Sequence, residues 1–562
     1  MIEIGSRWGL SKEGNITLED KKIAVPNVLF LSGDEMNPPD DAEVALSVDD
    51  GTMTIAGSFF GGSSDRTIPT TFSYPFGTEG TIVDERGGDE RVQILFDQEP
   101  DPEAELYVIG NAPKLLSRSK DLYRRIAEIR RKIDLNKILY LPGIAHPRNI
   151  ALFTYLGVDL FDSAFCEYLS SRGISVDDWM DAEGDGKENN FALQREIKNV
   201  REAVEKGYIR ELVETRIRPE PWMVEVLRFA DDDYELFSTG VPVTGGKIKV
   251  TTREGLNRPD IKRFQRRLRG RYTPPNRDVL LLLPCSARKP YFLSRSHKRF
   301  RDAVQAGDWT NIHEVILTSP MGAVPRELEQ FYPAQNYDIP VTSKWFEEER
   351  EVIISGLNTI LEKGGYNSII SHLPSDMDFV ESNIPENIDH IDTTDGDHPT
   401  DKEALKRLSE AVRELAGKNL GHVKGFLNEN LTKFAEFQFG KGGEALTEGA
   451  VIKGRYPYYK IIGDEGQRGM IVAERGLISL TIEGASILKD KNVNLVEIDD
   501  FVPKGTVFAV GVKDADPGIR PEDECIVVHD GDLRGVGPAV MSGPEMKVSD
   551  SGGAVRIRHY SK

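Results

Sequence analysis

The sequence predicts a multidomain α/β protein that ends in a β-rich domain, and three observations support this. The chain has 562 residues, more than one hydrophobic core normally serves. Up to about residue 240, helix-like segments alternate with short apolar strands, as in parallel sheets and β/α barrels. The glycine-rich stretch 493–560 carries the short strands typical of a small barrel.

These patterns predict four domains. We expect a TIM-like β/α barrel over residues 1–240 and a central α/β domain over 241–400. A small α+β domain is expected over 401–488, and a β-barrel over 489–562.

Net charge limits how the chain can meet nucleic acid. A formal charge of −21 argues against broad, non-specific affinity for phosphates. Basic residues nevertheless cluster in the segments 118–132 and 262–271. Each cluster is read either as an RNA contact or as a solvated helix face. Specific binding of a folded RNA therefore stays open.

Cysteine usage and hydropathy point to the cytoplasm. Cys166, Cys285 and Cys525 are too far apart for a disulfide framework or a clustered zinc site, so no metal is expected. The N-terminal residues lack a signal-peptide pattern, and no apolar run is long enough for a membrane span. No nucleotide-binding fingerprint stands in a strand–helix context, so no cofactor is expected either.

The segment 284–297 holds the densest group of reactive side chains. It contains Cys285, Ser286, Arg288, Lys289, Tyr291, Ser294, Ser296 and His297. A thiol beside cations at a strand-to-loop turn can be partly ionised and nucleophilic. Arg288 and Lys289 are equally suited to a phosphate or a carboxylate. The alternative is that Cys285 is a small apolar core residue.

Three apolar strands of the central domain end in turns that can form one crevice. The strands are expected over 279–283, 315–318 and 368–371, and the turns bring in Cys285, then Ser319 and Gly322, then His372. Ligands of open α/β sheets bind at the carboxyl ends of the strands. We therefore expect Ser319, Gly322 and His372 to help bind the substrate.

The last seventy or so residues resemble the PUA domain, which occurs on many RNA-modifying enzymes. The resemblance rests on Gly518-Ile519-Arg520-Pro521-Glu522-Asp523-Glu524, the strand at 526–528, Val536-Gly537 and Ser542-Gly543-Pro544-Glu545-Met546. Glu522 replaces a glycine that is usual in this family. The resemblance implies RNA binding through the barrel face and does not imply catalysis.

Residues 156–164, Leu-Gly-Val-Asp-Leu-Phe-Asp-Ser-Ala, resemble the nucleophile segment of archaeal tRNA-guanine transglycosylases, which are β/α barrels. Asp162 takes the position of the aspartate that attacks the ribose. Two features of that family are missing. The turn at 57–59 follows Ile55 where the family has an aspartate, and the zinc site would have Cys166 alone. We therefore expect Asp162 to be a vestigial nucleophile.

The combination of these features is similar to the archaeosine synthase alpha subunit family, over nearly the whole chain. The resemblance implies a substrate tRNA that carries preQ0 (7-cyano-7-deazaguanine) at position 15. It implies addition of an amine to the nitrile, which gives an amidine, with lysine as the favoured donor and glutamine or ammonia as alternatives. It also implies a radical-SAM partner subunit, while a homodimer stays open.

Two mechanisms fit this chemistry. Cys285 would add to the nitrile to give a thioimidate, with His297 moving protons and Lys289, Arg288 and Ser286 stabilising charge or holding the donor. Alternatively the pocket orients the amine directly, and Cys285 is structural. Tyr291, Ser294 and Ser296 are expected to bind substrate. A transglycosylase that uses Asp162 and a non-enzymatic tRNA-binding scaffold are the competing functions.

Overall fold

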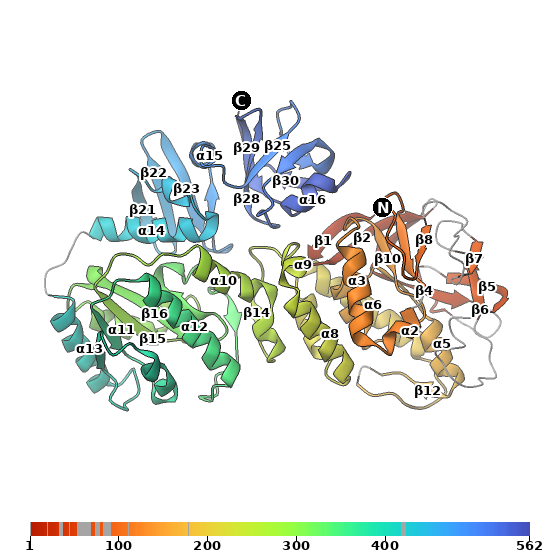
Figure 1. The fold of residues 1–562 in the computed structure, drawn as a ribbon, viewed down its shortest axis with the longest axis horizontal. Helices are drawn as coiled ribbons and strands as arrows, with labels where there is room; N and C mark the ends of the chain where they lie inside the picture. The colour runs from red at the N-terminus through yellow and green to blue at the C-terminus, as the bar shows by residue number, and fades with distance from the viewer. Residues whose placement is uncertain are drawn as a thin grey trace. The chain divides into compact units, whose positions relative to one another are not determined.

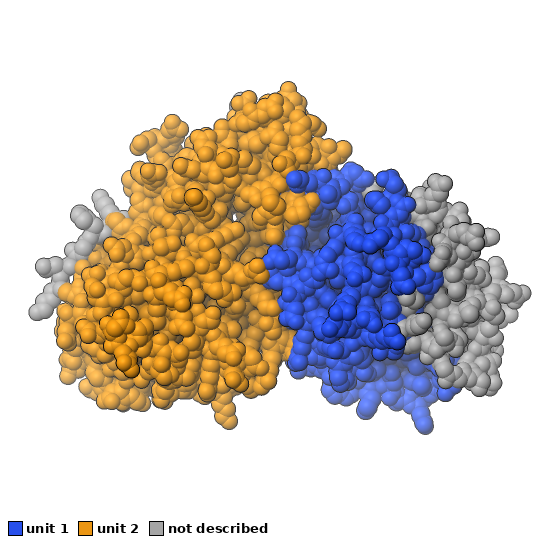
Figure 2. Space-filling view, in the orientation of Figure 1, with its two compact units in different colours: residues 1–242, 545–552 blue, residues 243–544, 553–562 orange. Residues whose placement is uncertain are grey.

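The chain divides into two compact units in the computed structural model. Residues 1–242 with 545–552 form unit 1, and residues 243–544 with 553–562 form unit 2 (Figure 2). The structure describes residues 2–18, 21–32, 38–43, 45–52, 69–73, 79–81, 92–110, 112–177, 179–417 and 423–561. In these residues, no helix is long and apolar enough to cross a membrane.

Unit 1 is built on an eight-stranded mixed sheet in the order β7-β6-β5-β4-β11-β10-β9-β8 (Figure 1). The strands are β4 (Asn27–Ser32), β5 (Ala45–Thr52), β6 (Pro69–Ser73), β7 (Glu79–Thr81), β8 (Val92–Leu95), β9 (Leu106–Ile109), β10 (Ile138–Tyr140) and β11 (Leu160–Asp162). The neighbouring strands β5, β4, β11, β10, β9 and β8 all pair in parallel. Strand β6 pairs antiparallel with β5 on one side and with β7 on the other. An antiparallel hairpin sheet, β1 (Glu3–Trp8), β2 (Ser11–Leu18) and β3 (Lys21–Val25), precedes it.

The expected closed TIM-like barrel is not confirmed. Within the described residues, β7 and β8 are the two ends of the sheet, and no strand pairing joins them. The helices of this unit are α2 (Ala112–Leu116), α3 (Ser119–Arg130), α4 (Ile150–Tyr155), α5 (Ala164–Ser171), α6 (Asn189–Glu205), α7 (Ile209–Arg216), α8 (Pro221–Asp232) and α9 (Tyr234–Ser238). Helix–strand alternation predicts parallel pairing correctly, but closure depends on contacts between distant strands that periodicity does not encode.

The sheet that carries the reactive segment has the order β17-β16-β15-β19-β20. Its strands are β15 (Val279–Pro284), β16 (Ile312–Thr318), β17 (Gly322–Pro325), β19 (Ser368–Ser371) and β20 (Asp389–Asp392). All of them are parallel except the edge strand β17. The chain leaves β15 toward β16 on one side and later returns to β19 on the other. This is the flavodoxin-like arrangement, with a topological switch point between β15 and β19.

Helices cover both faces of this sheet. Helix α11 (Arg295–Val304) lies on the connection from β15 to β16, and α12 (Glu347–Lys363) lies on the connection that returns past β15 to β19. Since these two crossovers run in opposite directions along the sheet, the right-handed rule puts the two helices on opposite faces. Helix α13 (Lys402–Leu415) packs beside α11, and α10 (Pro259–Gly270) packs beside α12. Because both faces of the sheet are covered, β15 and β16 are buried on both sides, which explains their continuous apolar sequences.

The rest of unit 2 is a helix followed by β-rich segments. It comprises α14 (Val423–Phe439), the antiparallel sheet β21 (Val451–Arg455), β22 (Tyr458–Gly463), β23 (Gly466–Val472) and β24 (Leu477–Leu480), and helix α15 (Ile482–Lys489). The C-terminal β domain contains β25 (Leu495–Ile498), β26 (Thr506–Phe508), β27 (Val512–Ala515), β28 (Glu524–His529), β29 (Asp532–Pro538), β30 (Gly553–Arg556) and β31 (His559–Tyr560), with α16 (Gly543–Val548) before β30.

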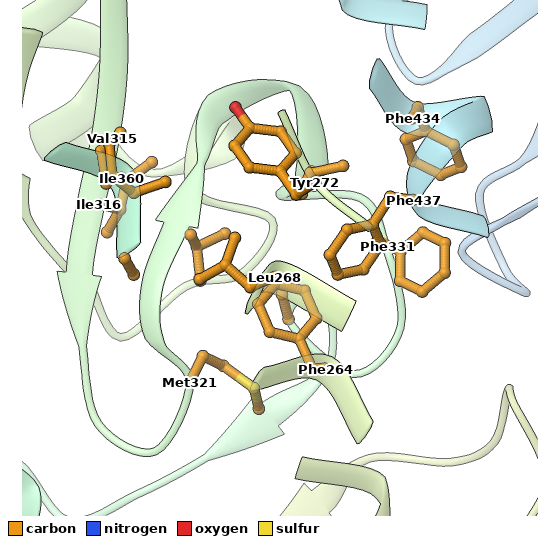
Figure 3. Close-up of a cluster of buried hydrophobic side chains, with 14 of the residues drawn as sticks. Phe264, Leu268, Tyr272, Val315, Ile316, Met321, Phe331, Ile360, Phe434 and Phe437 are labelled. Atoms are coloured by element: carbon orange, nitrogen blue, oxygen red, sulfur yellow. The ribbon is translucent and has the colours of Figure 1, made fainter. Parts of the chain in front are cut away.

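A shared aromatic core joins α14 to the central sheet. Phe437 of α14 lies 5.1 Å from Phe264 of α10 and 4.8 Å from Phe331, measured between ring centroids (Figure 3). Phe434 of α14 lies 5.3 Å from Phe331. Edge-to-face and tilted pairs of this kind add to the stabilisation from burial alone. Residues on both sides of position 400 therefore share one core.

Candidate functional site

The reactive segment lies at the switch point of the central sheet. Cys285 directly follows β15, and His372 directly follows β19. These two strands are hydrogen-bonded neighbours and run parallel, so their carboxyl ends meet at one edge. Ser319 follows β16, on the other side of β15. The three turns that the sequence predicts to form one crevice thus lie along one edge of the sheet.

Cys285 is set apart from the other two cysteines by its exposure. Its residue is partly exposed, whereas Cys166 and Cys525 are fully buried. Burial raises the pKa of the Cys285 thiol above its ordinary value, and the Thr318 hydroxyl and the Lys289 ammonium act in the opposite direction. The thiol therefore rests mainly protonated and needs a base before it can act as a nucleophile.

Lys289 is the cation that interacts with this thiol. Its Nζ lies 4.0 Å from the centroid of the Tyr337 ring. Burial lowers the pKa of Lys289, and the nearby Cys285 and Asp338 partly offset this lowering. A lowered lysine pKa beside a raised thiol pKa brings the two groups closer to proton exchange.

A buried chain of hydroxyls lies beside Cys285 and Lys289. The Tyr291 and Tyr337 hydroxyls are 2.5 Å apart, and Tyr337 also lies 2.6 Å from the Thr318 hydroxyl. Thr318 Oγ1 donates to the Ser319 carbonyl at 2.9 Å. Tyr337 comes from β18 (Tyr337–Asp338), which pairs with β14 (Ile248–Lys249) outside the main sheet. This chain fixes the orientation of Tyr337 beneath Lys289.

His297 is buried and uses both ring nitrogens. Nδ1 accepts from the Arg326 guanidinium at 2.8 Å, which leaves Nε2 to donate to the Pro284 carbonyl at 3.0 Å. Burial, and then Arg326, hold the pKa of His297 well below its ordinary value. The imidazole is therefore neutral and orients the carbonyl that precedes Cys285.

Arg326 is itself held by two carboxylates. It pairs with Glu314 at 2.7 Å and with Glu329 at 2.8 Å. Glu329 also accepts from the Phe292 amide at 3.0 Å. This network links the end of the reactive segment to β16 and to the turn after β17.

The remaining polar residues of the segment have mainly local contacts. Ser294 caps α11, since its hydroxyl accepts from the His297 amide at 3.1 Å, and it lies 3.3 Å from the Ser296 hydroxyl. Ser286 donates to the Arg288 carbonyl at 2.9 Å. The Arg288 side chain is exposed, so it remains available to an anionic group.

The other two turns supply residues of different kinds. Ser319 Oγ is buried and has no hydrogen-bond partner among the described residues. Gly322 has φ +84°, and a Cβ there would lie 2.6 Å from the Val352 carbonyl oxygen of α12, so only glycine fits. His372 is buried, with one ring nitrogen 2.8 Å from the Thr393 hydroxyl and the other 2.7 Å from the Pro399 carbonyl. Burial lowers its pKa to about 4.

Sequence reasoning missed four residues of this site. Thr318 lowers and Asp376 raises the pKa of Cys285, Cys285 in turn raises the pKa of Tyr337, and Arg326 lowers the pKa of His297; these are the four missed residues, Thr318, Asp376, Tyr337 and Arg326. Thr318 closes an expected strand and was detectable from its place at the strand end. The others come from segments that only the tertiary fold brings to the thiol.

The transglycosylase-like segment holds its aspartate in a closed environment. Asp162 is buried and accepts from the Tyr140 hydroxyl at 2.6 Å and from the Gly143 and Ala164 amides, each at 2.9 Å. Burial raises its pKa, which these three donors partly offset. Both carboxylate oxygens therefore accept hydrogen bonds from protein donors. Ile55 and the turn 57–59 lie outside the described residues.

One group of potential metal ligands occurs in the described part of the chain, and it lies outside the crevice. Glu497, His529 and Asp530 bring one ligand atom each within 4.8 Å of one another, in the C-terminal domain. His529 Nδ1 already lies 2.9 Å from the Ile498 carbonyl. Exposed groups of this kind commonly hold no ion.

The chemical state of Cys285 is testable by alkylation. We expect iodoacetamide to modify Cys285 alone in the folded protein, at a rate that rises with pH through a pKa above that of free cysteine. Lys289→Gln removes a cation that lowers this pKa, so the rate near neutral pH falls. Intact-protein mass spectrometry over a pH series measures both effects. Lys298→Gln, an exposed lysine on α11, is the matched control and leaves the rate unchanged. An unaltered profile in Lys289→Gln would contradict the pairing.

Comparison with family models divides the chain into recognisable parts. A domain of unknown function (DUF5591) matches residues 261–412, the PUA domain matches 496–561, and a queuine tRNA-ribosyltransferase model matches 91–178. The first of these covers the sheet that carries Cys285.

Curated relatives match over most of the chain. An archaeosine synthase of Haloferax volcanii is 34% identical, over 100% of this chain and 99% of its own length. An archaeosine synthase subunit alpha of Methanosarcina acetivorans is 34% identical, over 82% of this chain and 80% of its own. A tRNA-guanine(15) transglycosylase of Methanococcus maripaludis is 24% identical, over 81% of this chain and 70% of its own length.

The tRNA-ribosyltransferase segment and the PUA domain, together with the names of the relatives, assign the chain to the tRNA-modifying transferases. With 34% identity to both relatives, over at least 80% of each chain, the protein belongs to the archaeosine synthase family.

Proposed function

We propose that this protein makes an amidine from the nitrile of preQ0 at position 15 of tRNA, with lysine as the donor amine and Cys285 as the nucleophile. The function agrees with the names of its full-length relatives. The observation that supports the chemistry is the placement of a partly exposed thiol beside Lys289 at the switch point, while Cys166 and Cys525 are buried.

The first half of the reaction activates the nitrile. Burial lowers the pKa of Lys289 and so enlarges its neutral fraction; in that form its amine takes the proton of the Cys285 thiol, and the thiolate sulfur bonds to the nitrile carbon. The nitrile nitrogen receives a proton from the Lys289 ammonium, which leaves a neutral thioimidate and a neutral lysine side chain. A thioimidate is a better electrophile than a nitrile, so one slow step becomes two faster ones.

The second half transfers the donor. The donor amine bonds to the thioimidate carbon, the carbon–sulfur bond breaks, and the thiolate leaves. The proton released by the amine returns to the sulfur through Lys289, which restores the starting thiol. Exposed Arg288 is placed to bind the carboxylate of a lysine donor, and the unpartnered Ser319 hydroxyl is available to the substrate.

His297 has a positioning role in this scheme. Both of its ring nitrogens are engaged and its pKa is lowered, so it orients the Pro284 carbonyl instead of shuttling protons. Ser294, Ser296, Tyr291, Gly322 and His372 shape the crevice through caps, the hydroxyl chain and close packing.

Mass spectrometry of tRNA tests the proposed function. Transcripts carrying preQ0 are incubated with the protein and isotopically labelled lysine, glutamine or ammonium in separate reactions, then digested to nucleosides. We expect a product heavier than preQ0 nucleoside by one lysine. Direct formation of the simple amidine from glutamine or ammonium would overturn lysine as donor. Exchange of labelled guanine without any amidine would overturn the function and assign the reaction to the Asp162 segment.

The remaining proposals concern organisation. We propose the division 1–240, 241–400, 401–488 and 489–562, in which the second and third parts share one hydrophobic core, the first is related to transglycosylase barrels and the last binds tRNA through a barrel face. Relatives are named subunit alpha, which supports a partner subunit that processes the lysine adduct, of the radical-SAM class by family resemblance. We place the protein in the cytoplasm, where tRNA is modified.

A further inference from the structure

A cavity borders the reactive segment at Phe292, and Cys285 is not part of its lining. It has a volume of about 240 Å³ and lies between α11, the turn after β17, helix α14 and the hairpin β21–β22. Its lining includes Phe292, Trp309, Phe426, Tyr456, Tyr459 and Gln330, and we call it the aromatic pocket. Successive residues separate the two sites: Tyr291 joins the hydroxyl chain of the crevice, while Phe292 lines the aromatic pocket.

The charged side chains of the pocket wall are paired with protein groups. Arg326 is held by Glu314 and Glu329, and Tyr456 donates to Glu329 at 3.0 Å. Arg301 donates to the Phe292 carbonyl at 2.8 Å and stacks on its ring at 3.7 Å. Glu327 accepts from the Tyr272 hydroxyl and lies 3.6 Å from His313. A ligand that suits this wall is therefore uncharged.

One residue of the lining, Gln330, carries an unsatisfied polar atom. Gln330 is 6% exposed, and its Oε1 has no hydrogen-bond partner among the described residues. A buried acceptor without a donor costs free energy, so native proteins normally supply one. The same lining contains Phe292 and Tyr456, whose rings stack with their centroids 4.1 Å apart. A ligand that complements this lining has a flat apolar ring and carries one hydrogen-bond donor.

We propose that the aromatic pocket binds a neutral heteroaromatic ring that donates an N–H to Gln330, which is the chemistry of a nucleobase. The volume is below the roughly 300–1,000 Å³ of pockets for drug-sized ligands, so it suits one ring system. The base comes either from a free nucleoside or from an unstacked nucleotide of bound RNA, since aromatic stacking serves both. This site is independent of the amidine chemistry at Cys285.

Two arms distinguish the sources. In the first, the full-length protein is titrated with adenosine, guanosine, cytidine and uridine by saturation-transfer NMR and calorimetry. In the second, unmodified tRNA is cross-linked to the protein with ultraviolet light, and the attached peptides are mapped. We expect one arm to locate a base at Trp309, Phe426 or Tyr456.

Variants identify the contact. Gln330→Met keeps the size of the side chain but removes the acceptor, and we expect about tenfold weaker binding, or the loss of the cross-link. Gln335→Met changes a second buried glutamine of the same segment that does not line the pocket, and binding is unchanged. If adenosine binds, N6,N6-dimethyladenosine, which lacks the N–H, binds Gln330→Met and wild type equally.

Two results would overturn the proposal. One is that no nucleoside binds and no cross-link maps to the pocket, as expected if a water satisfies Gln330. The other is binding that Gln330→Met and the pocket-filling variant Leu427→Trp leave unaltered, which would place the base elsewhere. Circular dichroism checks that each variant is folded. If Leu427→Trp does not fold, the binding measured for Gln330→Met decides whether the pocket holds the base.

Discussion

Replacing Cys285 with alanine is expected to lower the rate of amidine formation by at least about 10³-fold, because nucleophile removal eliminates the covalent route and leaves only binding and orientation. Cys285 is the partly exposed cysteine of the three and lies at the switch point beside Lys289. Affinity for tRNA is expected to stay the same, since the substitution removes no charge at neutral pH. Single-turnover kinetics on preQ0-containing tRNA, together with a filter-binding measurement, separate the two quantities.

A matched variant shows whether the effect belongs to this thiol. Cys166→Ala removes a buried cysteine whose pKa is raised by burial and whose thiol donates to the Ala145 carbonyl. It keeps the full rate if the chain folds. A Cys285→Ala enzyme that retains more than about a tenth of the rate would favour the direct route, in which the pocket orients the amine and the thiol is structural.

Replacing Asp231 with alanine is expected to destabilise unit 1 by about 3–5 kcal/mol, which is the usual cost of leaving one member of a buried ion pair alone. The Arg210 side chain is fully buried. It donates to the two carboxylate oxygens of Asp231 at 2.5 and 2.9 Å, to Glu214 at 2.8 Å and to the Tyr155 hydroxyl at 3.0 Å. Without Asp231, the guanidinium keeps Glu214 but loses its bidentate partner.

The neighbouring aspartate provides the control. Asp232 is exposed on the same helix, α8, so Asp232→Ala changes stability by less than about 0.5 kcal/mol. Hydrogen exchange of the α7 amides gives the local free energy of opening, which suits a chain of two units better than one global transition. Equal protection in both variants would show that the Arg210 pair does not stabilise this unit.

Local patterns in the sequence were sufficient for three of the five strands of the central sheet, but not for β17 and β20. The expected strands 279–283, 315–318 and 368–371 are confirmed as parts of β15, β16 and β19. A buried parallel strand needs a continuous apolar run, and the turn after it needs small residues. Both features can be recognised in a short segment of sequence. The turn after the first of these strands directed attention to Cys285. The PUA domain was recognised from its motif residues, and the family model matches it over residues 496–561.

The tertiary structure alone decided the protonation states and the partners of these residues. His297 has the same sequence context whether it shuttles protons or positions a carbonyl, and only Arg326, 29 residues away, commits its Nδ1. Tyr337 reaches Lys289 from a strand outside the main sheet. Sheet closure in unit 1 likewise depends on which distant strands pair. Hydrophobic periodicity records burial along one segment, whereas a pKa, a hydrogen bond or a closed sheet depends on groups that folding brings together from several segments.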